Sequence, residues 1–73
     1  MSTSDKIRVL QIGCGGRAQT HIDSMQKCGA IELVALCDLD EPKLKATAEK
    51  FKIARTYTNM TEAIQKENAD VVD

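Results

Sequence analysis

The stretch "IGCGGRA", residues 12–18, places three glycines within four positions and decides the fold. It overlaps the end of the apolar run "IRVLQIG", residues 7–13, which is typical of a parallel strand buried on both faces. Apolar positions then recur at helical spacing up to Gly29, where a glycine that ends a helix is expected. The helical pattern places Ala18, His21, Ile22, Met25 and Cys28 on one stripe of this helix.

The rest of the chain continues the alternation of strands and helices. Three further strands are expected, at residues 31–38, 55–58 and 69–73. Asp40 is expected to cap a helix with an apolar face, and Asn59 with Glu62 resembles a capping box for a helix over about residues 60–67. The order β-α-β-α-β-α-β with short connections indicates an α/β fold of Rossmann type. It corresponds to the first half of a doubly wound parallel sheet, with strand order 3-2-1-4.

The chain has 73 residues and reads as one unit without repeats or linkers. It ends at Asp73, inside the fourth expected strand. We therefore interpret residues 1–73 as part of an NAD(P)-binding Rossmann domain of a longer protein, with a natural mini-domain as the alternative. The apolar edge of that fourth strand is expected to favour self-association.

Composition excludes several classes of partner. The formal net charge is −1, which gives no electrostatic argument for binding nucleic acid or an anionic membrane. No stretch approaches the roughly 20 apolar residues that span a bilayer, and "MSTSDK" does not resemble a leader. No pair among the three cysteines has the spacing of a zinc-binding or redox-active motif, so no metal site is expected. We interpret them as reduced thiols of a cytoplasmic protein.

The glycine cluster fits the G-x-G-x-x-G/A pattern at Gly13, Gly15 and Ala18. The first glycine makes the turn out of the strand, and the second lets the backbone approach a pyrophosphate. The third small residue lets the helix pack closely on the strand. The helix that begins here would direct its free N–H groups and its positive dipole end at the phosphates. A glycine turn that serves another mononucleotide is the alternative.

An acid ends the second expected strand, at the place where such motifs bind the adenosine ribose. A carboxylate at Asp38 would accept hydrogen bonds from the ribose hydroxyls and repel a 2′-phosphate, which favours NAD over NADP. Leu39 follows it, where a cation would have suited NADP better. The candidate cofactor-binding residues are Gly13, Cys14, Gly15, Gly16, Arg17, Ala18, Asp38 and Leu39.

Three further residues have reactive or charged side chains, but their sequence context does not assign them a catalytic role. His21, the one histidine, has no partner that defines a catalytic constellation, so a packing or surface role on the helix is expected. Cys14 contributes only its backbone to the loop, with a reactive thiol as a minor alternative. Arg17 either pairs with a phosphate or is solvated at the helix start.

The segments "VLQIGCGGRAQTHI", "ELVALCDLDEPKLKATAEKF", "YTNMTEAI" and "ADVVD" resemble the amino-terminal part of the Gfo/Idh/MocA oxidoreductases. The resemblance implies an NAD(P)-dependent parent enzyme that transfers a hydride to or from a sugar, cyclitol or related polyol. It also implies a second domain that binds this substrate and commonly forms a homo-oligomer.

The same resemblance places the catalytic residues outside this sequence. The family's lysine lies in a later Glu-Lys-Pro motif, and its aspartate and histidine lie in the second domain. The chain by itself is therefore expected to hold no catalytic residue. A non-catalytic nucleotide-sensing protein is the alternative, and the residues that follow Asp73 would distinguish the two.

Overall fold

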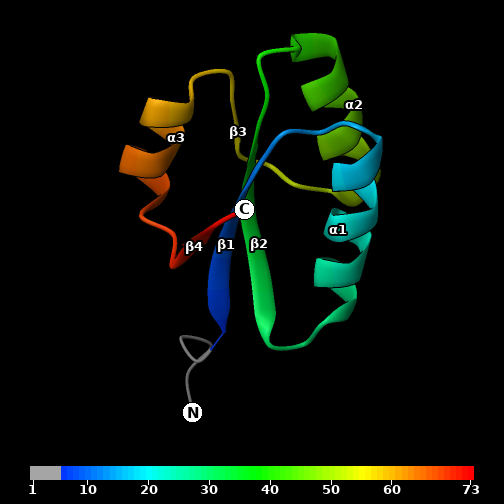
Figure 1. The fold of residues 1–73 in the computed structure, drawn as a ribbon, viewed down its shortest axis with the longest axis vertical. Helices are drawn as coiled ribbons and strands as arrows, with labels where there is room; N and C mark the ends of the chain where they lie inside the picture. The colour runs from blue at the N-terminus through cyan, green and yellow to red at the C-terminus, as the bar shows by residue number, and fades with distance from the viewer. Residues whose placement is uncertain (1–5) are drawn as a thin grey trace.

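Strands and helices alternate along the whole described chain (Figure 1). The computed structural model describes residues 6–73. The predicted domain begins at residue 1, and the interpretation of "MSTSDK" concerns mainly residues 1–5, which lie outside the described residues. The elements are β1 (Ile7–Ile12), α1 (Gly16–Lys27), β2 (Ile31–Cys37), α2 (Glu41–Phe51), β3 (Thr56–Tyr57), α3 (Met60–Glu67) and β4 (Val71–Val72). The predicted order of elements is confirmed, although every strand is shorter than the sequence suggested.

The strands form one parallel sheet within the described residues, in the order β3-β2-β1-β4. This confirms the predicted strand order 3-2-1-4. Helices α1 and α2 lie on one face of the sheet and α3 lies on the other (Figure 1). The change of side occurs because the crossover through α3 carries the chain from one edge of the sheet to the far side of β1. The carboxyl ends of β1 and β2 therefore meet at one edge, where ligands of such sheets bind.

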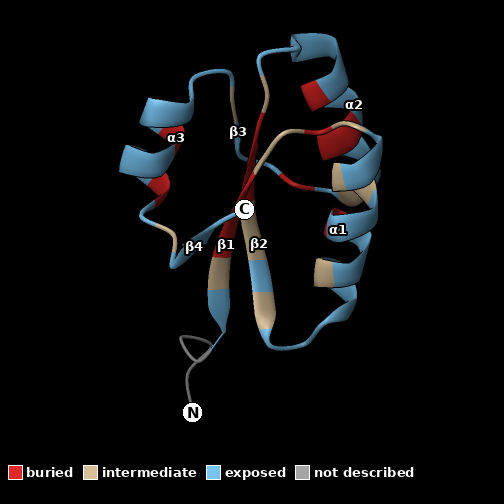
Figure 2. Ribbon diagram, in the orientation of Figure 1, coloured by how far each residue is buried: buried red, intermediate tan, exposed pale blue. Residues whose placement is uncertain are grey.

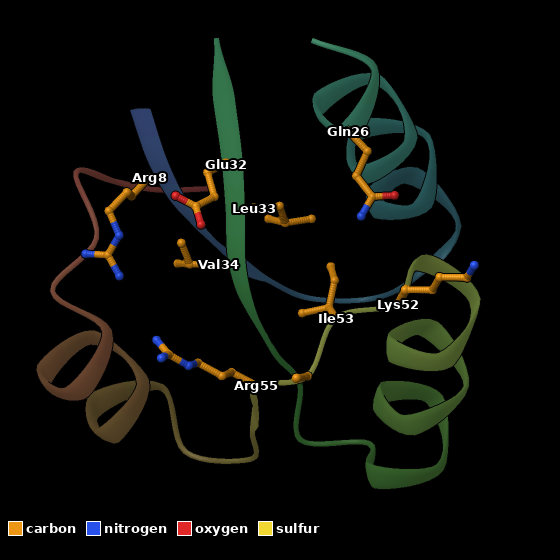
Figure 3. A pocket seen from close by; sticks show the side chains of 9 residues that line it. Arg8, Gln26, Glu32, Leu33, Val34, Lys52, Ile53 and Arg55 are labelled. Carbon is orange, nitrogen blue, oxygen red and sulfur yellow. The ribbon is translucent and has the colours of Figure 1, made fainter. Parts of the chain in front are cut away.

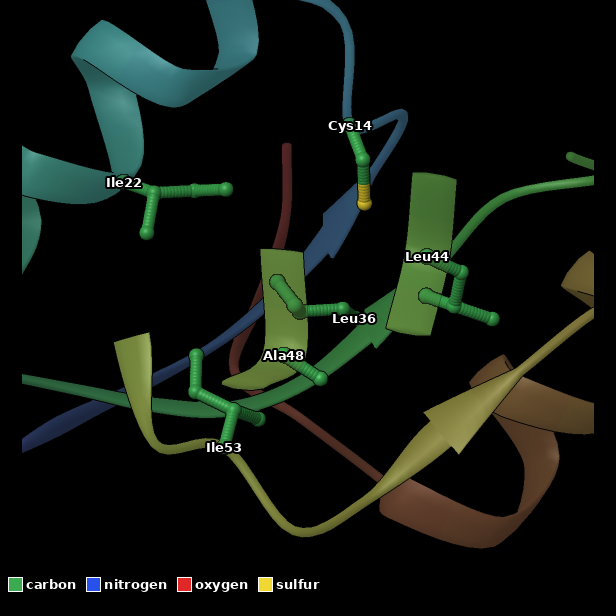
Figure 4. Close-up of a cluster of buried hydrophobic side chains, with 6 residues drawn as sticks. All are labelled: Cys14, Ile22, Leu36, Leu44, Ala48 and Ile53. Atoms are coloured by element: carbon green, nitrogen blue, oxygen red, sulfur yellow. The ribbon is translucent and has the colours of Figure 1, made fainter. Parts of the chain in front are cut away.

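Two apolar clusters hold the helices to the sheet, and Figure 2 shows the buried residues concentrated where helices and sheet meet. Cys14, Ile22, Leu36, Leu44, Ala48 and Ile53 form the cluster beneath α1 and α2 (Figure 4). Leu10, Ala35, Cys37 and Ala63 form the cluster beneath α3. The buried members of both clusters are aliphatic residues and cysteines, and Phe51 and Tyr57 are half-buried against them.

The predicted stripe of α1 is wrong in part. Ile22 is buried, but His21 is exposed and its Nδ1 lies 3.6 Å from the carboxylate of Asp73. Cys28 lies beyond the helix, because α1 ends at Lys27 and Cys28 adopts an extended C-cap conformation. Gly29 follows the cap but has no positive φ, so the helix ends without the left-handed glycine that the sequence suggested.

A buried carboxylate joins α3 to the sheet. The side chain of Glu67 is only 1% exposed, and its Oε1 lies 3.1 Å from Nη1 of Arg55 and 3.8 Å from Nη2 of Arg8. The hydroxyl of Tyr57 donates a hydrogen bond of 2.6 Å to Oε2. Figure 3 shows Arg8 and Arg55 reaching from β1 and from the segment before β3. No motif in the sequence indicates this network.

Candidate functional site

The glycine loop connects the carboxyl end of β1 to the amino end of α1. Gly13 has φ of 96°, a conformation that side chains rarely adopt, so the turn out of β1 requires glycine there. Its N–H donates a hydrogen bond of 2.7 Å to the carbonyl of Cys37, which extends the β1–β2 pairing by one step. The predicted role of Gly13 as the turn residue agrees with this geometry.

Helix α1 begins without a side-chain cap. Its N-cap residue is Gly15, and no acidic residue lies in its first turn. By contrast, Asp40 accepts a hydrogen bond from the N–H of Lys43 at the start of α2, and Asn59 accepts one from the N–H of Glu62 at the start of α3. The first N–H groups of a helix have no carbonyl partner within it, so those of α1 remain available to a ligand.

The surface of the loop is open where a pyrophosphate would approach. A Cβ placed at Gly13, Gly15 or Gly16 would meet no heavy atom within 4 Å outside its neighbours in the chain. The glycines are therefore not needed to relieve crowding inside the protein. Their lack of side chains leaves space outside it, beside the N–H groups of α1, and the residues present fit a dinucleotide pyrophosphate.

Asp38 fastens the glycine loop to the end of β2. Its Oδ2 accepts a hydrogen bond of 2.8 Å from the N–H of Cys14, and its Oδ1 accepts one of 2.8 Å from the N–H of Asp40. The hydrogen bond from Asp40 is the main reason that the pKa of Asp38 lies below its usual value. The carboxylate is thus ionised at neutral pH, and each oxygen keeps a second lone pair for a ligand hydroxyl.

The lowered pKa of Asp38 predicts a loss of stability in acid. A carboxyl whose pKa is lower in the folded state stabilises the fold above its unfolded pKa, near 3.8, and this contribution disappears as the pH falls through the folded value. Urea unfolding followed from neutral pH to below this value should therefore show a smaller acid-induced decrease for Asp38→Asn than for the unsubstituted chain. Asp23→Asn, at an exposed pair with Lys27, is the control and should leave the decrease unchanged.

The other predicted site residues lie around the same edge of the sheet. Gly16 and Arg17 are exposed in the first turn of α1, and Ala18 is half-buried behind them. Within residues 6–73 no carboxylate lies within ion-pair distance of Arg17, so its charge is available at the helix start. Leu39 is 89% exposed beside Asp38, so its side chain offers an apolar surface at the ribose end of the site.

The side chain of Cys14 belongs to the core. Its sulfur points into the cluster of Figure 4, and the residue is only 1% exposed. Burial is the main cause that raises the pKa of the thiol, and the nearby Asp38 carboxylate raises it further. Burial and the raised pKa both argue against the minor alternative of a reactive thiol, because the side chain is shielded from solvent and its thiolate form is disfavoured.

Two glutamines that no motif in the sequence indicates bind the loop carbonyls. Gln11 donates from Nε2 to the carbonyls of Ile12 and Gly13, at 3.2 and 3.3 Å. Gln19 donates from Nε2 to the carbonyl of Cys14 at 3.3 Å and to Oγ1 of Thr47 at 2.9 Å. A signal for Thr47 was present, because it falls three residues after Leu44 on the apolar stripe of α2, where a polar residue needs a partner.

A hollow lies elsewhere on the molecule. Arg8, Glu32, Lys52 and Arg55 are among its lining residues, and it runs beside the amino-terminal half of β2 (Figure 3). It is therefore away from the glycine loop, which follows the carboxyl end of β1. The described residues 6–73 contain no group of three or more acidic, histidine or cysteine side chains placed to hold a metal. Among the helices of this part of the chain, none is long and apolar enough to cross a bilayer.

Comparison with known proteins agrees with this geometry. D-apiose dehydrogenase of Paraburkholderia graminis is 32% identical over 72 residues, which are 99% of this chain and 19% of that protein. A crystal structure of an oxidoreductase from Agrobacterium radiobacter, with NAD+, L-tartaric acid and magnesium, matches 93% of this chain and 20% of its own. The TM-score is 0.88 and the identity 26%. The WlbA dehydrogenase of Chromobacterium violaceum, solved with NADH and UDP-GlcNAcA, covers the same 93% and 20% with a TM-score of 0.85 and 33% identity.

The chain thus spans about a fifth of the length of these relatives. The family model of Gfo/Idh/MocA proteins, described as an oxidoreductase family with an NAD-binding Rossmann fold, matches residues 7–73. The resemblance stated from the sequence and the expected NAD-binding Rossmann fold are confirmed at the level of the family. The chain belongs to the Gfo/Idh/MocA oxidoreductase family.

Proposed function

We propose that this chain binds the pyrophosphate and adenosine ribose of NAD at the edge formed by the glycine loop and Asp38. The observation that carries the proposal is the open glycine loop in front of an uncapped helix, while the two other described helices are capped by their own side chains. The first N–H groups of α1 would bind the phosphate oxygens, and Arg17 would add a positive charge beside them. When bound, the cofactor supplies the hydride chemistry.

Asp38 performs two tasks in this proposal. Its hydrogen bond from Cys14 fixes the loop relative to β2, and its remaining lone pairs accept from the ribose hydroxyls. The negative charge at this point opposes a 2′-phosphate, which makes NAD the preferred cofactor over NADP. Leu39 covers the neighbouring part of the adenosine with an apolar side chain.

For the whole protein, we propose an NAD-dependent oxidoreductase that transfers a hydride between the cofactor and a sugar, cyclitol or related polyol. Support comes from relatives named for D-apiose and solved with UDP-GlcNAcA or L-tartaric acid, all rich in hydroxyl groups. Residues 1–73 would be part of its cofactor-binding domain, and the catalytic and substrate-binding residues would be supplied by other parts of the protein.

We also propose that the protein is a cytoplasmic homo-oligomer. The three free cysteines, two of them buried, support a reducing compartment. Val71 and Val72 of β4 are each 46% exposed at the edge of the described sheet, and we expect residues 6–73, taken by themselves, to associate through this edge. Sedimentation that shows only monomers over a wide range of concentrations would contradict association at this edge.

The experiment that tests NAD binding compares two substitutions of Asp38 by titration calorimetry with NAD and with NADP. Asp38→Ala removes the anchor of the loop as well as the charge, so it should weaken both cofactors, and NAD more than NADP. Asp38→Asn keeps an acceptor for the N–H of Cys14, and should shift the ratio of the two affinities toward NADP by about tenfold. An unchanged ratio in both variants would show that Asp38 does not discriminate between the cofactors.

A further inference from the structure

Gln19 and Thr47 connect the glycine loop to α2, and we call this pair the brace. We propose that the brace fixes the peptide group between Cys14 and Gly15, so that the Gly15 N–H faces the bound anion. The inference rests on the proposed function, because the anion is taken to be the pyrophosphate of the dinucleotide. Nothing in the glycine pattern itself assigns a role to either residue.

The contacts of the brace converge on Cys14. Gln19, in the first turn of α1, uses one amide nitrogen for the carbonyl of Cys14 at 3.3 Å and for the Thr47 hydroxyl at 2.9 Å. The N–H of Cys14 donates to Asp38. The residue between the first two glycines is thus held at both its N–H and its carbonyl.

Because the peptide group is planar, the contacts of the Cys14 carbonyl also restrict the direction of the Gly15 N–H. In a trans peptide the carbonyl of one residue and the N–H of the next point in opposite directions. Because Gln19 holds the Cys14 carbonyl on the side of α2, the Gly15 N–H must point away from α2. Gly15 and Gly16 have wide conformational freedom, so without the brace this peptide could rotate and present its carbonyl oxygen to the phosphates instead.

The burial of Thr47 supports a positioning role. Thr47 is only 1% exposed within the otherwise apolar inner face of α2, which includes Leu44 and Ala48. A buried hydroxyl is tolerated only when it is hydrogen-bonded, and its partner, the amide nitrogen of Gln19, also binds the carbonyl of Cys14. Lys50 contacts the other end of the Gln19 amide, donating to Oε1 at 3.1 Å, and does not touch the loop carbonyl. It therefore provides a matched control.

The test measures the order of the Gly15 amide by NMR, using its heteronuclear NOE and its exchange with solvent, without any cofactor. Gln19→Met keeps the length of the side chain but removes its donor, and should lower the NOE and accelerate exchange about tenfold. Thr47→Val should act in the same direction, and Thr47→Ser, which restores the hydroxyl, should return the amide to its original behaviour. Lys50→Met should leave it unchanged.

NAD titrations of the same variants complete the test. Gln19→Met should raise the Kd for NAD about fivefold to tenfold, whereas Lys50→Met should not. The proposal is wrong if the Gly15 amide stays ordered in Gln19→Met and the affinity for NAD is unchanged. It is also wrong if the amide stays ordered and the substitution lowers only the unfolding midpoint. If the unsubstituted chain does not bind NAD, the proposed function fails for this chain, and the order of the Gly15 amide in the variants still decides the brace.

Discussion

Gly15→Val is expected to abolish NAD binding and leave the fold intact. A Cβ placed at this position meets no heavy atom within 4 Å outside its neighbours in the chain, and Gly15 has φ of −74°, which valine adopts without strain. The added methyl groups would instead occupy the space beside the first N–H groups of α1. Loss of two hydrogen bonds from this helix to a charged phosphate should weaken binding by at least about 100-fold. Calorimetry with NAD and thermal unfolding of the same sample measure both quantities.

Two other glycines separate the effect on binding from an effect on folding. Gly29→Val is the matched control, because Gly29 also has open space and no positive φ but lies at the opposite end of α1. It should change neither property appreciably. Gly13→Ala should lose stability, by about 1–3 kcal/mol, because alanine is strained at a φ of 96°. Tight NAD binding by Gly15→Val would contradict the proposed position of the pyrophosphate.

Glu67→Ala is expected to cause the largest loss of stability. The carboxylate is nearly inaccessible and accepts from Tyr57 and Arg55, so its removal leaves a cavity between α3 and the sheet and unpairs both donors. We expect the free energy of unfolding to fall by about 3 kcal/mol, a large part of the stability of a small domain. Urea denaturation measures this difference directly.

The control for this substitution keeps the shape of the side chain. Glu67→Gln retains an oxygen that can accept from Arg55 or Tyr57 and fills the same space, so its loss should be about 1 kcal/mol. Equal destabilisation by both variants would show that the charge, and not the filled space and hydrogen bonds, holds α3 in place. No destabilisation by either variant would contradict the structural role of Glu67.

The sequence was informative where function depends on neighbouring residues. The turn at Gly13, the open positions at Gly15 and Gly16, and the acid at the end of β2 all follow from local spacing. Local rules also placed the caps: Asp40 caps α2, and Asn59 accepts from Glu62, although Glu62 pairs with Lys66 at 3.2 Å through its side chain. Strand order followed in turn from the alternation of elements.

Contacts between residues that are distant in the sequence could not be predicted from local spacing. Gln19 of α1 forms a hydrogen bond with Thr47 of α2, and Glu67 pairs with Arg8, which lies near the other end of the sequence. Neither pairing has a periodic signature. Each depends on how the helices rotate against the sheet, and that rotation is set by the summed packing of Ile22, Leu44 and Ala63. A buried polar side chain indicates that a partner exists but does not say which residue provides it.

The uncapped start of α1 has a further consequence for protein engineering. A capping side chain in place of the glycine N-cap would stabilise the helix by about a few tenths of a kcal/mol, and this chain lacks that gain at this position. A variant that introduced serine or aspartate at residue 15 would compete with the ligand for the same donors. Selection for thermal stability alone would therefore favour residues at the start of α1 that weaken dinucleotide binding. In this single turn, stability and ligand binding place opposite demands on the same residue.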